Sequence, residues 1–422
     1  MRIWIVTVGE PLPTDSGLQR LLRSGLLAKM LVGQGHDVIW WTSAFDHQAK
    51  RIRGPLPNKE FDKLGYKINL LWGCGYSRNV SLKRIIDHHL IAIAFARQVS
   101  NEINPDIILS SYPTIEMCDA VLDYAKPRDI PVILDIRDLW PDIFINLVPD
   151  WARFFSRTLL YSMMRASRRV CADATAVIGI TESFVNWGVA RAGRDRHAWD
   201  CAYPLAYEAK SKDDKSLASA RAYWDALGLE ANLPIVCFFG TLGRQFDIPC
   251  LIAAARLLAR EKVQFVICGV GDRLPEYREM SVDLPNVHFP GWVDAPAISA
   301  LMERSLAGLA PYHNETSFTM SLPNKAIEYL AGALPVVSTL QGELERLLNE
   351  NKCGITTESG NPQAFADGIR ILLSDSVQRQ KMSNNALTLF NQKFMAEGVY
   401  QQLIDHLELI ATQYPQGKKP IR

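Results

Sequence analysis

Short apolar runs alternate with amphipathic helical stretches along almost the whole chain, and this alternation constrains the fold more than any other feature of the sequence. A strand, a helix and a second strand in succession join parallel neighbours in a sheet whose two faces are covered by helices. In the first half we expect strands at residues 2–8, 37–43, 67–72, 106–111, 131–136 and 174–180. In the second half we expect strands at residues 235–240, 264–269, 287–292, 307–312 and 334–339. The pattern predicts an α/β protein with doubly wound, Rossmann-like sheets.

The length of 422 residues allows two to three domains of about 150 residues each. Residues 208–220 are charged or small, with almost no large apolar side chains, so we interpret them as a linker. We therefore expect one domain at 1–207 and a second at 208–395. Ligands of doubly wound sheets bind at the carboxyl ends of the strands, and a cleft between the two domains is the predicted active site.

Composition disfavours several classes of protein. Lys and Arg number 46 against 45 Asp and Glu, and a net charge of +1 predicts no nucleic acid partner. The eight cysteines form no C-x-x-C pair, which disfavours zinc fingers and thioredoxin-like redox sites. No stretch approaches the roughly 20 apolar residues that span a bilayer, and the N-terminus does not resemble a secretory signal. We expect a reduced, cytoplasmic protein.

The strongest functional signal is the segment SLPNKAIEYLAGALPVVST at residues 321–339. A Pro-Asn turn opens a helix there, and a helix N-terminus offers unpaired N–H donors and a partial positive charge. Lys325 lies in the first turn, which suits a phosphate, and Glu328 could accept hydrogen bonds from ribose hydroxyls. An ordinary capped helix whose glutamate faces solvent explains the same residues equally well.

The segment CGVGD at residues 268–272 invites comparison with dinucleotide-binding turns. Such a turn requires G-x-G-x-x-G, but position 274 is Leu. The strand at 37–43 also ends without the acidic residue that the ribose of NAD requires. We therefore expect no nicotinamide cofactor and no redox function.

The run SLPNKxxEYLAxxLPVVS resembles the donor-binding segment of retaining GT-B glycosyltransferases of family four, the glycosyl transferase group 1 enzymes. Further segments are similar to the branch that builds bacterial surface polysaccharides, and they occur in family order at residues 9–43, 135–142, 238–247, 268–272 and 289–294. The resemblance implies a GT-B fold, with two Rossmann-like domains facing each other across a cleft. It also implies that a terminal helix at about 396–422 packs back on the first domain.

The resemblance places a donor site in the second domain. Gly240 and Gly243 would form a tight turn after a strand, and Arg244 and Lys325 would be the two cations on the donor diphosphate. The open alternative for Arg244 is a surface ion pair with Asp247. The remaining implied donor-binding residues are Thr241, Gly271, Asp272, Trp292, Val293, Ser321, Leu322, Pro323, Asn324 and Glu328.

One position departs from the family pattern. The common signature has two glutamates separated by seven residues; Glu328 matches the second, but Met320 stands at the first position. An apolar side chain cannot accept hydrogen bonds from sugar hydroxyls. We therefore expect the donor sugar to be held by other groups, such as the backbone of residues 319–322.

The first domain would supply the acceptor side. Thr14, Arg20 and Arg23 lie in and after the first βα loop, which the resemblance directs towards donor phosphate or acceptor. Arg20 and Arg23 are three residues apart, on one predicted helical face, and a solvated basic face is the open alternative. Arg137 and Asp138 follow the strand at 131–136, and we assign Asp138 as the base for the acceptor hydroxyl. A structural ion-pair cluster with Asp135 is the alternative for both.

The stretch 151–169, WARFFSRTLLYSMMRASRR, carries five arginines and no acid. A basic amphipathic helix with aromatic side chains can lie in the interface of an anionic membrane. A core helix with a solvated basic edge explains the same pattern. A lipid-linked acceptor, which the resembled family often uses, would favour contact with the inner face of the cell membrane.

These features predict a retaining glycosyltransferase that moves a sugar from a nucleoside-diphosphate sugar to a glycan or lipid-linked acceptor in cell-surface polysaccharide synthesis. No acidic D-x-D-type pair stands beside the phosphate site, so we expect neither a metal nor a cofactor. Two alternatives stay open: a nucleotide-sugar epimerase of the same fold, and a non-catalytic, membrane-associated assembly protein with a degenerate donor site.

Overall fold

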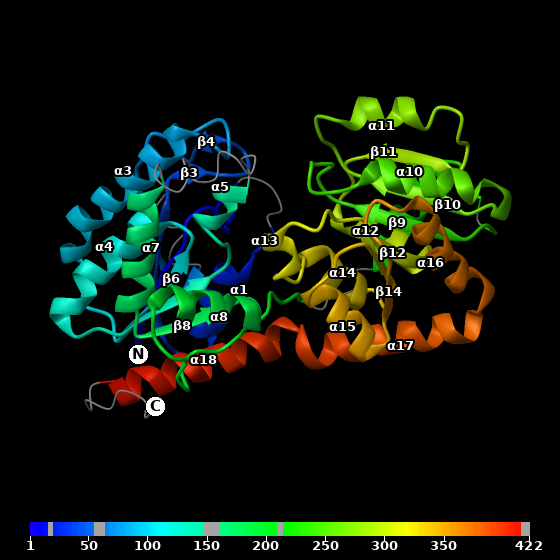
Figure 1. The fold of residues 1–422 in the computed structure, drawn as a ribbon. Helices are drawn as coiled ribbons and strands as arrows, with labels where there is room; N and C mark the ends of the chain where they lie inside the picture. Colours follow the sequence, from blue (N-terminus) through cyan, green and yellow to red (C-terminus); the bar gives the residue numbers. More distant parts are fainter. Residues whose placement is uncertain (16–19, 55–63, 147–159, 209–213, 231, 415–422) are drawn as a thin grey trace. The chain divides into compact units, whose positions relative to one another are not determined.

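The computed structural model describes residues 1–15, 20–54, 64–146, 160–208, 214–230 and 232–414 (Figure 1). The chain divides into two compact units. Unit 1 comprises Met1–Pro204 with Val399–Arg422, and unit 2 comprises Leu205–Gly398. Each unit is an α/β domain around a six-stranded parallel sheet, as the alternating sequence pattern predicts.

The sheet of unit 1 has the strand order β5-β2-β1-β6-β7-β8. The chain adds strands first on one side of β1 (β2, β5) and then on the other (β6, β7, β8), so the strand order reverses between β1 and β6. Its strands are β1 (Arg2–Val6), β2 (Asp37–Ser43), β5 (Lys67–Leu71), β6 (Ile107–Tyr112), β7 (Val132–Ile136) and β8 (Ala176–Gly179). A short antiparallel pair, β3 (Phe45–Asp46) and β4 (Arg51–Ile52), follows β2. The helices are α1 (Arg23–Gly33), α3 (Leu82–Gln98), α4 (Ile115–Ala125), α5 (Asp142–Asn146), α7 (Tyr161–Asp173) and α8 (Glu182–Ala192).

The central strands of unit 1 are nearly continuous apolar runs because both faces of the sheet are covered. Trp4 on β1 lies 5.4 Å, centroid to centroid, from both Trp41 on β2 and Tyr124 on α4. Phe95 on α3 packs edge-on against Trp41 at 5.0 Å. These rings form the interior of the unit.

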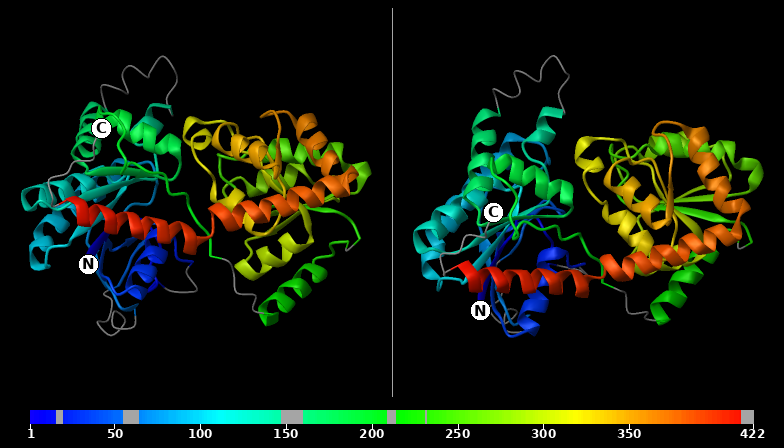
Figure 2. Two further views of the ribbon diagram at one scale, coloured as in Figure 1. Left: turned by 90° about the horizontal axis from the view of Figure 1, so that it is seen from below. Right: turned by 60° about the horizontal axis from the view of Figure 1, so that its bottom comes forward.

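A last helix, α18 (Ala396–Gln413), returns to complete unit 1 (Figure 2). Its side chains Leu403, Ile404, Leu407 and Ile410 are fully buried. Polar contacts fix its position beside α1, where Gln34 Nε2 donates to Gln401 Oε1 at 2.6 Å and His36 Nε2 lies 3.1 Å from Glu408 Oε1.

The sheet of unit 2 has the order β11-β10-β9-β12-β13-β14, and here the order reverses between β9 and β12. Its strands are β9 (Ile235–Phe239), β10 (Gln264–Cys268), β11 (Val287–Gly291), β12 (Ser305–Ala310), β13 (Val336–Ser338) and β14 (Gly354–Thr356). Its helices are α9 (Asp214–Ala226), α10 (Ile248–Leu257), α11 (Leu274–Met280), α12 (Ala295–Arg304), α13 (Thr316–Thr319), α14 (Asn324–Ala331), α15 (Glu343–Asn351), α16 (Pro362–Ser374) and α17 (Ser376–Lys393).

The predicted linker at 208–220 is wrong from Asp214 onward, because this part forms α9 and belongs to unit 2. Leu217 and Trp224 are buried, and Trp224 Nε1 donates to Ala297 O of α12 at 2.8 Å. Because the helix begins with charged residues, the composition of this stretch does not indicate its apolar face.

The chain crosses between the units at Pro204–Leu205 and at Gly398–Val399, each within three residues of the boundaries predicted from the sequence, 207/208 and 395/396. Two backbone bonds hold the crossing segments together: Tyr207 N donates to Phe394 O and Ala396 N donates to Tyr207 O, both at 3.0 Å.

Candidate functional site

The candidate site lies at the carboxyl ends of the strands of unit 2, around the point where the strand order reverses between β9 and β12. Doubly wound sheets bind ligands at such a point because the helices leave it on opposite faces. The loops 240–247, 269–273, 292–294 and 311–323 emerge there, the last leading into α14. All residues predicted on the donor side lie on these four loops or on α14.

Glycines bring the first two loops into backbone contact. Gly240 and Gly269 have φ values of +143° and +141°, which L side chains rarely adopt. A Cβ on Gly269 would lie 1.8 Å from Gly240 O, and a Cβ on Gly271 would lie 2.3 Å from Leu242 O. Gly240 N donates to Cys268 O at 3.0 Å, and Leu242 N donates to Val270 O at 2.9 Å. The loop after β9 is therefore fixed against the loop after β10.

Lys325, at the start of α14, reaches across to the end of β9. Its side chain is only 9% exposed, and its Nζ donates a hydrogen bond to Phe239 O. The ammonium lies 4.4, 5.5 and 4.9 Å from the ring centroids of Phe238, Phe239 and Phe246, which favours a cation. A Cβ on Gly240 would lie 2.2 Å from Nζ, so a side chain there would displace the ammonium, and the φ of +143° would strain it as well.

Burial lowers the pKa of Lys325 from 10.5 to about 8, although Glu328 raises it in part. A buried cation with a strongly shifted pKa is costly for stability and is concentrated at functional sites. The sequence pattern predicts this cation but not the three phenylalanines around it. The repeated aromatic residues in the run IVCFFG were the available signal.

Arg244 lies on the same loop and is exposed. Within the part of the chain that the structure describes, Arg244 has no hydrogen bond or ion pair, and it does not pair with Asp247. Asp247 instead caps α10, because its Oδ1 accepts a hydrogen bond from Cys250 N at 3.0 Å. Arg244 therefore presents its charge to solvent at the carboxyl ends of the strands.

The N-terminus of α14 lacks a side-chain cap, since Pro323 occupies the N-cap position. Its first bonds run from Ala326 N and Ile327 N back to Pro323 O, at 3.0 and 3.4 Å. No acceptor for the N–H groups of Asn324 and Lys325 lies among the described residues. These two donors can bind an anion.

The remaining donor-side residues lie on the same four loops or on α14. Thr241, Asp272 and Trp292 are exposed, whereas Gly243, Val293, Ser321, Leu322 and Glu328 are half-buried. Val293 and Leu322 pack on the hydrophobic core, and Ser321 Oγ donates to Phe318 O at 3.1 Å. Met320 directly follows α13.

Unit 1 contains a cluster of four charged residues near its own point of strand reversal, three of them buried and Arg137 half-buried; the sequence pattern does not indicate one member, Glu10. Arg23 binds Asp135, with Nε 3.0 Å from Oδ2 and Nη2 donating to Oδ1 at 3.1 Å. Arg137 pairs with Glu10 and, at 2.7 Å, with Asp135. Burial alone would raise the pKa of Asp135, but the two guanidinium groups hold it below its ordinary value. We call Glu10, Arg23, Asp135 and Arg137 the charged cluster.

Glu10 also occupies the N-terminus of α1. Its carboxylate accepts hydrogen bonds from Ser24 N at 3.0 Å and from Ser24 Oγ at 2.9 Å. A carboxylate here satisfies the donors that a phosphate would bind at a helix N-terminus. The protein's own side chain therefore fills this anion site of unit 1.

The prediction that Arg20 and Arg23 share a helical face is wrong, because α1 begins at Arg23. Arg23 is 2% exposed, binds Asp135 and donates a hydrogen bond to Tyr203 O at 2.7 Å. It therefore contributes neither to a solvated basic face nor to an open ligand site. Arg20 is exposed, and the Thr14 hydroxyl is buried.

Asp138 lies outside the charged cluster. It is half-buried and accepts a hydrogen bond from Leu139 N at 2.8 Å. Burial raises the pKa of Asp138, against smaller opposing effects of the bond from Leu139 N and of Arg84. The alternative of an ion-pair cluster thus describes Asp135 and Arg137 and not Asp138.

Part of the basic stretch 151–169 lies outside the described residues, which resume at Leu160. In α7, Tyr161, Arg165 and Arg168 are exposed. Arg169 faces α4, where its guanidinium lies 3.3 Å from Asp119 and also pairs with Asp123. No helix in the described part of the chain is both long and apolar enough to cross a membrane.

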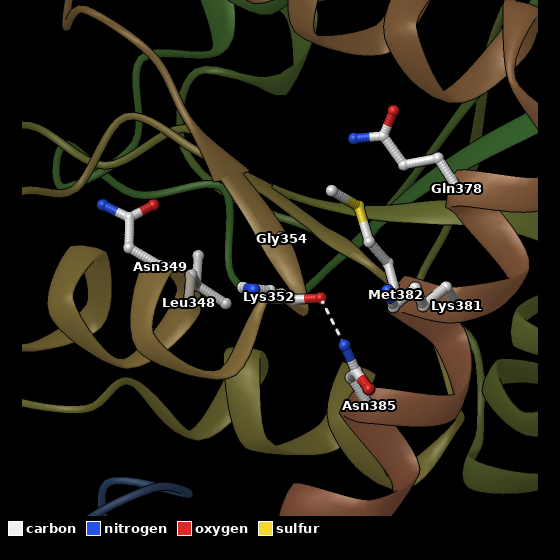
Figure 3. Close-up of a pocket in the computed structure, with 8 residues that line it drawn as sticks. All are labelled: Leu348, Asn349, Lys352, Gly354, Gln378, Lys381, Met382 and Asn385. Carbon is white, nitrogen blue, oxygen red and sulfur yellow. Dashed lines mark hydrogen bonds between the residues drawn. The ribbon is translucent and has the colours of Figure 1, made fainter.

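A pocket of about 310 Å³ lies elsewhere in unit 2, between α15, the start of β14 and α17 (Figure 3). Its lining consists of Leu348, Asn349, Lys352, Gly354, Gln378, Lys381, Met382 and Asn385. Asn385 Nδ2 donates to Lys352 O at 3.0 Å across it. The pocket contains none of the predicted site residues.

Comparison with known proteins finds a family match within unit 2. Residues 233–375 match the model of the family described as glycosyl transferases group 1. An uncharacterized glycosyltransferase of Methanocaldococcus jannaschii is 25% identical over 184 residues, which cover 43% of this chain and 46% of that protein. The D-inositol 3-phosphate glycosyltransferase of Corynebacterium urealyticum is 33% identical over 207 residues, covering 46% and 47% of the two chains. The chain thus spans about half the length of these curated relatives.

Among solved structures, Anabaena HepE in complex with UDP and glucose is similar over 97% of this chain and 99% of its own, with a TM-score of 0.65 and 17% identity. Both doubly wound sheets are included in a match of this extent. The chain therefore has the GT-B fold, with a glycosyl transferase group 1 domain over residues 233–375.

Proposed function

We propose that this protein is a retaining glycosyltransferase that moves a sugar from a nucleoside-diphosphate sugar to a glycan or lipid-linked acceptor in cell-surface polysaccharide synthesis. The observation that carries the proposal is the buried ammonium of Lys325, fixed beside Gly240 at the strand reversal of unit 2. It is accompanied by the exposed guanidinium of Arg244 and by the N–H groups of Asn324 and Lys325, which have no acceptor among the described residues. Together they supply several donors and two cations for a diphosphate.

The chemistry follows from where charge develops. As the bond between the sugar and the diphosphate breaks, the sugar gains oxocarbenium character and the leaving phosphates gain negative charge. Groups fixed in advance at the leaving phosphates stabilise the transition state more than the ground state. Lys325, Arg244 and the start of α14 take this role. We propose that no metal and no cofactor is needed, because protein cations supply the charge.

The base and sugar of the donor are open to direct test. HepE was solved with UDP and glucose, which supports UDP-glucose as the first donor to try. The exposed Trp292 and the neighbouring backbone of Val293 follow β11, and we propose that they contact the base. Glu328 would bind the ribose hydroxyls, and the backbone of residues 319–322 would replace the missing first glutamate at the sugar.

On the acceptor side we propose that Asp138 removes the proton from the attacking hydroxyl. Burial raises its pKa, which makes the carboxylate a stronger base. Arg137 is already paired with Glu10 and Asp135, so its role is to hold the neighbouring backbone in place. A lipid-linked acceptor would bring a cytoplasmic enzyme to the inner face of the cell membrane, and 151–169 is one proposed contact.

The test is a thermal-shift panel of UDP, GDP, ADP, CMP, dTDP and NAD, with and without Mg²⁺. A ligand that binds only the folded state raises the melting temperature by mass action. We expect one diphosphate to give a shift without metal, and Arg244→Ala to reduce that shift. The matched control is Arg256→Ala, which removes an exposed arginine paired with Asp283 on the surface of unit 2.

The alternatives predict different results. An epimerase would convert the donor sugar without an acceptor, so the donor is incubated alone and its sugar identified. A non-catalytic assembly protein would bind no nucleotide. A shift from NAD alone would refute the proposal.

A further inference from the structure

We propose that the outer face of α3 is a membrane-contacting surface that binds anionic lipid bilayers. This inference goes beyond the proposed transferase function and does not depend on it. It concerns a helix of unit 1 that is separate from the stretch 151–169.

An apolar stripe runs along the solvent face of α3. Leu82, Ile86, Leu90 and Ile93 are 79%, 54%, 39% and 48% exposed. At about 100° per residue, their spacing of four, four and three places all of them within an arc of roughly 80°. With a rise of about 1.5 Å per residue, the stripe is about 16 Å long. We call these four residues the α3 stripe.

The opposite face of α3 accounts for the packing of the helix. Ile91 and Phe95 are buried in unit 1, and α4 lies alongside α3 (Figure 1). The helix therefore does not need the α3 stripe to hold its place. A contiguous row of exposed large aliphatic side chains on a folded domain marks an interaction surface.

The charges beside the α3 stripe identify its partner. Lys83 is exposed on one flank of the stripe. Arg97 is exposed at the C-terminal end of the stripe. The one acid on the helix, Asp87, is buried and accepts a hydrogen bond from Gly75 N at 2.6 Å. The exposed face of α3 is therefore apolar and cationic.

The acids on neighbouring elements have partners of their own. On α4, Glu116 lies 3.6 Å from both His88 and His89, and Asp119 and the exposed Asp123 share Arg169. Glu102, beyond the end of α3, binds Lys67 at 2.5 Å. Aliphatic side chains flanked by cations match the acyl chains and anionic headgroups of a bilayer surface.

The experiment measures partition of the full chain onto phosphatidylcholine vesicles with and without phosphatidylglycerol, in the absence of nucleotide. We expect wild-type protein to bind the anionic vesicles, and binding to weaken with salt. The double variant Leu82→Gln with Ile86→Gln should lower the partition coefficient by about tenfold or more. Lys83→Gln with Arg97→Gln should remove the preference for phosphatidylglycerol.

The matched control is Val282→Gln with Val377→Gln, which replaces two exposed aliphatic residues of unit 2. It should bind vesicles like wild type, and all variants should melt like wild type because each side chain is exposed. Equal binding by wild type and the α3 double variant would overturn the proposal, as would a lack of wild-type binding. Loss of binding only in Arg165→Gln with Arg168→Gln would assign the contact to α7 instead.

Self-association is a further decisive outcome. A dimer in sedimentation that the α3 double variant abolishes would assign the stripe to a second copy of this chain and overturn the lipid proposal. Nucleotide thermal shifts on the same variants separate this inference from the transferase function. Vesicle binding without any nucleotide shift would refute only the proposed function.

Discussion

Replacing Lys325 by methionine should stabilise the protein at neutral pH and remove one component of its pH dependence. Folding moves the pKa of Lys325 from 10.5 to about 8 because the side chain is buried. Below pH 8 both the folded and unfolded states bind the proton, and the full cost of burying the charge is present. Between pH 8 and 10.5 only the unfolded state binds it, so the free energy of unfolding rises with pH. Above 10.5 both states are neutral and the rise ends.

The size of the effect follows from the shift. A difference of about 2.5 pKa units corresponds to about 3 kcal/mol, at 1.36 kcal/mol per unit. Methionine fits a site lined by three phenylalanine rings and carries no charge. We therefore expect Lys325→Met to be more stable than wild type at pH 7 by up to about 3 kcal/mol, and this gain to disappear by pH 10.5.

The assay is urea unfolding of wild type and variant at intervals from pH 7 to 10.5, with the difference between the two proteins plotted against pH. All other titrating groups contribute equally to both curves and cancel. Lys381→Met on α17, an exposed lysine, is the control and should show no trend. A difference between wild type and Lys325→Met that stays constant over this range would refute the reasoning, since the lysine would then titrate alike in both states.

The remaining predictions concern three other residues. Gly240→Ala should displace the Lys325 ammonium, since the new Cβ would lie 2.2 Å from Nζ. It should lower the free energy of unfolding by about 1–3 kcal/mol and reduce the nucleotide thermal shift. Gly33→Ala, where a new Cβ would meet nothing within 4 Å, is its control. Arg244→Ala should lower kcat/KM by about 10²–10³ with an unchanged melting temperature; equal loss in Arg256→Ala would contradict a specific role. Arg23→Met should cost about 3–5 kcal/mol in denaturant unfolding, because it leaves Asp135 short of one buried partner; a loss below about 1 kcal/mol would show that the charged cluster is not structural.

The sheets could be predicted because both faces of their central strands are buried. Strands such as β2 and β9 are continuous apolar runs, and their ends follow from where those runs stop. β14 was missed because three residues, Gly354–Thr356, carry too little pattern. The helix α9 was missed because its buried residues are spaced among charged and small ones, and only its packing on α12 shows that it is part of a domain.

The candidate site was predicted as a set of loops but not as a set of contacts. Sequence order locates Gly240 after β9 and Lys325 at the start of α14, yet nothing local indicates that their atoms meet. Arg23 shows the same limit: a basic residue near a loop suggests solvent or a ligand, whereas its partner Asp135 is far away in the sequence. Burial of a charge is decided by tertiary partners, and these are not encoded in local spacing.

The return of α18 to unit 1 sets the order in which the two units can be completed on the ribosome. Unit 2 is continuous from Leu205 to Gly398, so its core can close as soon as that stretch has emerged. Unit 1 begins first but receives Leu403, Ile404 and Leu407 only with the last helix. The apolar surface that these side chains cover therefore stays exposed while the whole of unit 2 is synthesised, and exposed apolar surface in a nascent chain is prone to aggregation.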